Sequence, residues 1–253
     1  MVDRSANVLR RAVGRFSRHG VWLPVIRRTG DTSVVALTYD DGPSERTTPA
    51  LLEVLRAFDA KATFFLTGVR VAAAPELVRQ ICADGHAVYA HGWEHVRYDR
   101  ETPERLLGDL DRTETELRRV RPTPRPYLVR LPYAAGLAET WVHESLRRWD
   151  PQVQFAHWAD SFLDWTLADG CETEEDLEAA CKRAIHRTLR RTSPAGAVFL
   201  LHEDPFDVTA ALSPVVAPML TQMLLEQVRP AGLRTEVVSA AKQVPRYRAY
   251  IRG

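Results

Sequence analysis

Apolar and polar residues alternate between strand-like and helix-like stretches from Ser33 onward. Short apolar, β-branched runs predict seven strands, over residues 33–39, 62–67, 87–91, 127–131, 154–159, 197–202 and 233–238. Apolar residues at helical spacing predict helices over residues 49–58, 75–83, 103–120, 137–148, 173–191 and 209–228. Strands that alternate with helices favour an α/β fold with a parallel sheet, either closed as a barrel or doubly wound.

Local signals support these helix boundaries. Thr48-Pro49 and Thr102-Pro103 each place a capping residue before a proline, which suits the first turn of a helix. Gly85 and Gly232 follow helical stretches and suit helix C-termini. The alternating region carries no internal repeat or low-complexity linker, so we predict one domain there.

Chemically capable residues stand where the predicted strands end. The residues at these ends are Asp40, Asp41, His91, His95, Arg130, Tyr133, Asp160, Asp164 and His202. In a closed parallel barrel, functional groups collect at the carboxyl ends of the strands. The pattern therefore predicts that these side chains, although distant in sequence, share one site.

Asp40 and Asp41 follow the first apolar run directly, before a Gly-Pro turn. Two adjacent carboxylates repel each other unless something compensates their charge, and a metal ion does so in many proteins. His91 and His95 stand four residues apart, a spacing that brings two imidazoles together. Two histidines and one carboxylate leave open positions for water and substrate, as in catalytic sites. These ligand types favour zinc, and they also suit cobalt, nickel, manganese or iron.

Five motifs resemble those of the NodB-homology polysaccharide deacetylases, a family of carbohydrate esterases. They occur in the family's order and are Thr38-Tyr39-Asp40-Asp41-Gly42-Pro43 (T-F-D-D-G-P), His91-Gly92-Trp93-Glu94-His95 (H-S/T-x-x-H), Arg130-Leu131-Pro132-Tyr133 (R-x-P-Y), Asp160 to Trp165 (D-x-x-D-W) and Leu200-Leu201-His202 (L-x-H). The resemblance implies a distorted (β/α)7 barrel over residues 32–253, after a basic extension over residues 1–31. It also implies metal-dependent removal of an N-acetyl or other N-acyl group from an amino sugar or oligosaccharide.

The resemblance implies a role for each residue at the site. Asp41, His91 and His95 would hold one divalent metal, and Asp40 would be the general base.

Arg130 would pair with Asp40, and the backbone N–H of Tyr133 would stabilise the oxyanion. His202 would be the general acid, and Asp164 would orient it. The residues implied as pocket walls are Pro132, Trp165 and Leu200.

Three positions depart from the family's pattern. Gly92 stands where a serine or threonine usually supports the metal loop, so the groups behind the metal ligands are built differently. The fourth motif has one extra residue, which leaves Asp160 and Asp164 as alternative partners of His202; the intact Asp-Trp pair favours Asp164. Glu203 follows His202 where aspartate is more usual.

Two other functions remain open from the sequence. The same metal chemistry could act on a non-sugar amide, a formamide or a cyclic imide in natural-product biosynthesis. A non-catalytic, saccharide-binding relative is the other alternative. The complete set of acidic and histidine residues argues against it, because saccharide binding alone does not need them.

Charge and composition limit the location and partners. The 34 basic and 33 acidic residues give a net charge of +1, which does not suggest nucleic-acid binding. The three cysteines form no C-x-x-C pair, which suits a reducing compartment. Seven arginines within residues 1–31 interrupt the apolar run that a secretory signal needs, so we predict a cytoplasmic protein. This basic segment suits a helix that caps the domain better than peripheral membrane contact.

Overall fold

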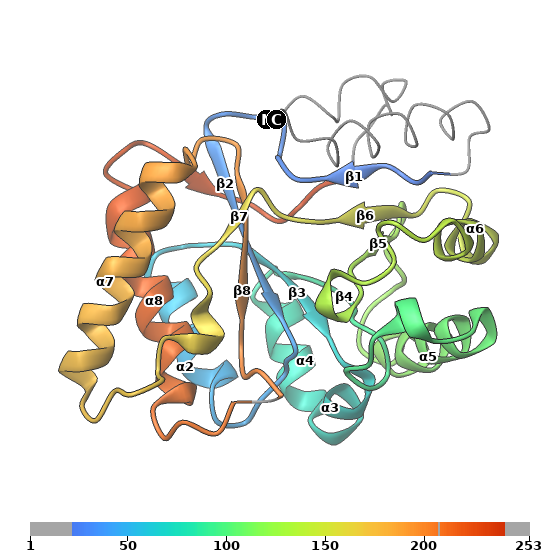
Figure 1. The fold of residues 1–253 in the computed structure, drawn as a ribbon, viewed down its shortest axis with the longest axis horizontal. Coiled ribbons are helices and arrows are strands. Elements are labelled where there is room, and N and C mark those ends of the chain that lie inside the picture. Colours follow the sequence, from blue (N-terminus) through green and yellow to red (C-terminus); the bar gives the residue numbers. More distant parts are fainter. Residues whose placement is uncertain (1–21, 207, 241–253) are drawn as a thin grey trace, which may run out of the picture.

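The computed structural model describes residues 22–206 and 208–240, and its centre is a set of parallel strands (Figure 1). The strands are β1 Val25–Ile26, β2 Val34–Asp40, β3 Ala62–Leu66, β4 Ala87–Ala90, β5 Leu128–Val129, β6 Gln154–Ala156, β7 Asp160–Ser161, β8 Val198–His202 and β9 Arg234–Thr235. The seven strands predicted from the sequence are confirmed. The short strands β1 and β7 are additional, since two-residue strands leave little periodic signal.

The strands form two sheets that together make a distorted (β/α)7 barrel, as predicted. One sheet has the order β4-β3-β2-β8-β7, with β9 beside the start of β2, and the other has the order β1-β6-β5. All of these ladders are parallel. Within residues 22–206 and 208–240, no ladder joins β4 to β5; instead the N–H of Ala90 donates to the hydroxyl of Tyr127, 3.0 Å away. The barrel is therefore interrupted at this seam.

Helices surround the strands, with α7 and α8 on one side of Figure 1 and α5 and α6 on the other. Their bounds are α2 Thr48–Ala57, α3 Gly68–Ala73, α4 Pro75–Ala83, α5 Pro103–Leu117, α6 Thr140–Trp149, α7 Glu174–Arg191 and α8 Ser213–Val228. Three 3₁₀ turns are η2 Tyr98–Arg100, η3 Pro132–Ala134 and η4 Asp164–Thr166. As predicted, Thr102 caps α5, because its side chain accepts the N–H of Arg105. Gly85 and Gly232 have φ values of +81° and +76°, and they follow the ends of α4 and α8 as predicted.

Strand β2 is buried along its whole length, which explains its continuous apolar run. β3 and β8 pair with it on both sides, and Tyr39 is fully buried with its hydroxyl 2.7 Å from that of Thr221 on α8. Burying an aliphatic side chain such as Leu37 stabilises the fold by roughly 1.5–3 kcal/mol. The pairing with β3 and β8, which extends to Asp40, fixes the position of the carboxylates at the end of β2.

Part of the predicted basic extension, residues 1–31, packs with the domain predicted over residues 32–253. β1 pairs with β6, and Leu23 and Ile26 are part of the hydrophobic core. Of the basic extension 1–31, residues 1–21 lie outside the described residues. No helix in the part of the chain that the structure describes is long and apolar enough to cross a membrane.

Candidate active site

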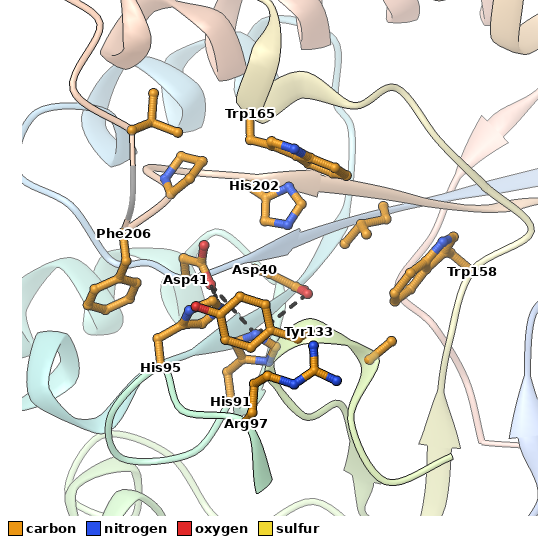
Figure 2. Close-up of a pocket in the computed structure, with 14 residues that line it drawn as sticks. Asp40, Asp41, His91, His95, Arg97, Tyr133, Trp158, Trp165, His202 and Phe206 are labelled. Carbon is orange, nitrogen blue, oxygen red and sulfur yellow. Dashed lines mark ion pairs between the residues drawn. The ribbon is translucent and has the colours of Figure 1, made fainter. Parts of the chain in front are cut away.

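A cavity of about 470 Å³ opens where β2, β4 and β8 end (Figure 2). It is lined by Asp40, Asp41, His91, His95, Arg97, Tyr133, Ala134, Trp158, Trp165, Leu200, His202, Pro205, Phe206 and Val208. The cavity therefore brings together predicted residues from all five motifs. The two remaining predicted polar residues, Arg130 and Asp164, lie behind it and contact Asp40 and His202.

The two neighbouring aspartates face different partners in the same cavity. Asp40 ends β2, and Asp41 has a left-handed backbone with φ of +78°. The main chain holds this turn, because the N–H of Asp41 donates to the carbonyl of Phe65 at 3.1 Å. Both carboxyl groups are almost fully buried. The turn therefore directs the two adjacent carboxylates toward different partners, so that each can have its own role.

Asp41, His91 and His95 form the candidate metal site. One ligand atom from each lies within 4.8 Å of the others. Oδ1 of Asp41 is 3.6 Å from Nε2 of His91 and 3.2 Å from Nε2 of His95. This oxygen is buried and accepts no hydrogen bond, so a cation would satisfy it. The three residues fit a divalent metal in donor type and spacing.

The protonation of these residues suits metal binding. Nδ1 of His91 lies 2.9 Å from the carbonyl of Arg130, which must accept from it, and Nε2 then presents its lone pair to the cluster. Burial lowers the pKa of His91 to about 4, so the imidazole is neutral near pH 7. Burial raises the pKa of Asp41 to about 7, and a bound cation would favour its ionised form.

Arg130 holds Asp40 in the ionised form. Its buried guanidinium donates from Nη1 to Oδ1 of Asp40 at 2.7 Å and to the hydroxyl of Thr38 at 2.8 Å. Nε donates to the carbonyl of Ala156 at 2.9 Å, and Nη2 donates to that of His157 at 3.2 Å. Burial alone would raise the pKa of Asp40, but the positive charge of Arg130 and its hydrogen bond lower it below its ordinary value.

Asp164, not Asp160, contacts His202. One carboxylate oxygen of Asp164 is 3.0 Å from Nδ1 of His202, and the other accepts the N–H of His202 at 2.6 Å. Asp160 instead forms an ion pair with Arg191 and accepts from the hydroxyl of Thr192. Leu163 takes a left-handed backbone with φ of +55°, and Asp164, which follows it, is buried.

The carboxylates around His202 favour its protonated form. Burial alone would lower its pKa, but the negative charges of Asp164, Asp41 and Asp40 raise it to about 9. Because Nδ1 faces Asp164, Nε2 is the nitrogen that can donate a proton to a group in the cavity.

The predicted pocket walls are present except for Pro132. Trp165 and Leu200 line the cavity, and the ring of Trp165 meets that of His202 edge-on at 5.0 Å between centroids. Tyr133 lies at the rim, half-exposed, with its ring centroid 4.4 Å from that of His95. Pro132 is buried and does not line the cavity. It begins turn η3, where the left-handed Tyr133 directs the chain toward the opening.

Arg97, Trp158 and Phe206 are cavity residues that the sequence analysis missed. Trp158 falls inside a predicted strand, and Phe206 follows the fifth motif by four residues, so neither carried a signal of its own. The ring of Phe206 stacks on that of His95 with centroids 5.2 Å apart. The position of Arg97, two residues after His95, was the one clue that could have indicated a cavity residue.

A family model described as polysaccharide deacetylase matches residues 27–153, about half of the chain, including Asp40, Asp41, His91, His95 and Arg130. The chain belongs to the polysaccharide deacetylase family. The resemblance drawn from the five motifs is therefore confirmed. A chitooligosaccharide deacetylase of Bradyrhizobium is 31% identical over 183 residues, which cover 71% of this chain and 76% of that protein.

Another relative is much longer than the matched region. PgdA of Listeria monocytogenes, a peptidoglycan-N-acetylglucosamine deacetylase, is 32% identical over 100 residues. These residues cover 40% of this chain and 22% of PgdA.

Solved structures share the fold. A family 4 carbohydrate esterase from Streptomyces lividans matches with a TM-score of 0.62 and 24% identity, over 83% of this chain and 95% of that chain. A family 4 pseudoenzyme from Bacillus anthracis matches with a TM-score of 0.64 and 18% identity, over 85% of this chain and 67% of that chain. Because one of them is a pseudoenzyme, the shared fold does not decide activity.

Proposed function

We propose that this protein is a metal-dependent hydrolase that removes the N-acetyl group from an amino sugar or short oligosaccharide. The observation that carries the proposal is the buried Asp41, His91 and His95 cluster, which shares one cavity with Asp40 and His202. An acetamide is a weak electrophile, so its hydrolysis needs an activated water, a stabilised oxyanion and an acid for the departing amine. The cavity offers a candidate for each of these needs.

Zinc is the metal that we propose for the site. Two imidazoles and one carboxylate are typical of catalytic zinc sites, although cobalt, nickel, manganese and iron also accept these ligands. When bound there, the metal would lower the pKa of a water molecule and polarise the acetyl carbonyl. Phe206 and Tyr133 border the ring of His95 and would restrict its movement.

Asp40 is the general base in this proposal. It lies beside the metal ligands, with Oδ2 at 3.7 Å from Nε2 of His91, and its other oxygen, Oδ1, forms an ion pair with Arg130. The ion pair keeps Asp40 deprotonated, so it can accept a proton from the attacking water. Arg130 also fixes the direction of the carboxylate through its bonds to Thr38 and Ala156.

His202 is the general acid, and Tyr133 supplies an oxyanion donor. Protonated His202 would donate from Nε2 to the nitrogen of the departing amine, while Asp164 stabilises its charge. The left-handed backbone of Tyr133 lies at the cavity rim, where its N–H would donate to the carbonyl oxygen as charge develops there.

The cavity walls suit an acetylated sugar ring. Trp158, Trp165 and Tyr133 offer flat aromatic surfaces beside the polar groups of the cavity. The Bradyrhizobium relative acts on chitooligosaccharides, which supports a sugar substrate. The cytoplasmic location, and the docking of residues 1–31 on the domain rather than on a membrane, stay predictions that cell fractionation can test.

The deciding experiment measures acetate release by the zinc-loaded protein. The sugar substrates are N-acetylglucosamine oligomers and soluble peptidoglycan fragments. In the non-sugar arm, formamides are followed by formate release and cyclic imides by their ring-opened product, because neither contains an acetyl group. Asp40→Ala should abolish turnover and keep the zinc content, whereas Asp41→Ala should lose both. Cleavage confined to the non-sugar arm would refute the sugar substrate. Loss of zinc in Asp40→Ala would show that the roles of the two aspartates are exchanged.

A further inference from the structure

The loop between the two metal histidines is held by a buried tyrosine outside the five motifs. Tyr98 begins turn η2 and has no exposed surface. Its hydroxyl accepts the N–H of Trp93 at 3.3 Å and donates to Oδ2 of Asp109 on α5 at 2.9 Å. The middle of the metal loop is therefore linked by one side chain to a helix.

Gly92 makes room for this hydroxyl. Its φ is +83°, and a Cβ added there would lie 2.5 Å from the hydroxyl oxygen of Tyr98 and 2.7 Å from Cε2 of its ring. Real Cβ atoms do not come so close to other heavy atoms, and the phenol ring has no space to retreat because it is buried on all sides. Tyr98 thus fills the space that a side chain at position 92 would need.

A second connection supports the first. Nε of Arg105 donates to Oδ2 of Asp109 at 2.8 Å, and Nη2 of the same guanidinium donates to Glu94 at 2.7 Å. Asp109 therefore accepts hydrogen bonds from the Tyr98 hydroxyl and from Arg105, which also donates to Glu94 in the loop. It is 7% exposed, so a negative charge here depends on these two donors.

Other elements hold the carbonyl groups of the loop, whereas the N–H of Trp93 depends on Tyr98 for its acceptor. The carbonyl of Gly92 accepts from the N–H of Gly68 and the hydroxyl of Thr113, each at 2.9 Å, and the carbonyl of Trp93 accepts the N–H of Val69 at 3.0 Å. The N–H of Trp93 is bonded to Tyr98. Without the hydroxyl, this nearly buried N–H would lose its acceptor, and the loop would shift to find another.

We infer that Tyr98, fixed by Asp109, is a positioning residue that sets the orientation of His91 and His95 for metal binding. It replaces the hydroxyl-bearing residue that the family's motif places at position 92. This inference rests on the metal site of the proposed function and not on the identity of the substrate. Partners that orient metal ligands typically change metal affinity 10- to 100-fold when they are removed.

The test compares two tyrosine-to-phenylalanine variants. Tyr98→Phe removes the proposed positioning hydroxyl. Tyr39→Phe is the matched control, because Tyr39 is equally buried and loses a hydroxyl that contacts Thr221 on α8 instead of the metal loop. Zinc affinity is measured by competition with a chromophoric chelator, and the visible spectrum of bound Co²⁺ reports the ligand geometry. Melting of the metal-free proteins checks that both variants fold.

Tyr98→Phe is expected to weaken zinc binding by about tenfold or more and to shift the Co²⁺ spectrum. Tyr39→Phe should remain within about twofold of the wild-type affinity. If Tyr98→Phe does not fold, Asp109→Asn replaces it, with an expected loss of at least about threefold. Wild-type affinity and spectrum in the folded Tyr98→Phe variant, or in the Asp109→Asn variant that replaces it, would overturn the inference and leave the proposed function intact. A wild-type protein that binds no divalent metal would overturn both.

Discussion

The contact between Asp164 and His202 provides a quantitative test of the proposed general acid. The perturbation is Asp164→Asn, which keeps the shape of the side chain and removes its negative charge. The carboxylate lies 3.0 Å from Nδ1 of His202. The pKa of His202 is raised from 6.5 to about 9 despite burial, with Asp164 as the main favourable charge. At 1.36 kcal/mol per pKa unit, the protonated form gains about 3 kcal/mol.

The expected result is a change in the alkaline limb of the pH profile. Without the charge of Asp164, burial offsets the remaining effect of Asp41 and Asp40, and the pKa of His202 should fall to about 6.5. The protonated fraction at pH 8 then drops from about nine-tenths to about 3%, so kcat/KM should fall about 30-fold. At pH 6 both proteins are mostly protonated, and the loss should be less than about twofold.

The assay is acetate release by the zinc-loaded enzyme between pH 5 and 10, because the pH dependence of kcat/KM reports the ionisations of the free enzyme. Asp160→Asn is the control, since that carboxylate pairs with Arg191 and should leave the profile unchanged. An Asp164→Asn enzyme with the wild-type alkaline limb, or with equal losses at pH 6 and pH 8, would refute the reasoning.

Three further predictions test other parts of the site. Arg130→Met leaves buried Asp40 unpaired and should lower the free energy of unfolding at pH 7 by about 3–5 kcal/mol in urea titrations. Because the pKa of Asp40 in the folded protein lies below 3.8, the ion pair with Arg130 stabilises the fold at pH values above 3.8 and this stabilisation is lost at lower pH. The difference in unfolding free energy between wild type and Arg130→Met should therefore shrink on acidification, and a difference that grows would contradict the prediction. Gly92→Ser restores the family's usual residue, yet it should weaken zinc binding about tenfold in chelator competition, because the new Cβ meets Tyr98; unchanged affinity would sink this prediction. Zinc at about 100 times its Kd should stabilise the protein by about 2.7 kcal/mol in thermal melts, and an equal gain in Asp41→Asn would place the metal elsewhere.

Much of the fold was predictable because its strands have strong local patterns. β2 and β8 are apolar runs that end in charged residues, and both were predicted close to their observed bounds. β1 and β7 are two residues long, and their pairing depends on neighbours distant in the chain, so periodicity did not reveal them.

The predicted site was most accurate where a residue's chemistry identifies its purpose. Asp41, His91 and His95 lie together as predicted, since few other roles explain adjacent carboxylates and spaced histidines at strand ends. Pro132 lies outside the cavity lining and Tyr133 lies within it, because the left-handed backbone of Tyr133 decides which side chain faces the cavity. Periodicity does not report such a turn.

By itself, the sequence determined the order of strands and helices, the family, and the residue types available for chemistry. These follow from local hydrophobic pattern and from motifs a few residues long. Only the tertiary structure decided that Asp164 rather than Asp160 contacts His202, that Trp158 and Phe206 wall the cavity, and that Tyr98 fills the space beside Gly92. Each of these depends on the distance between atoms brought together by the closure of the barrel, and such distances are set by packing across the whole chain.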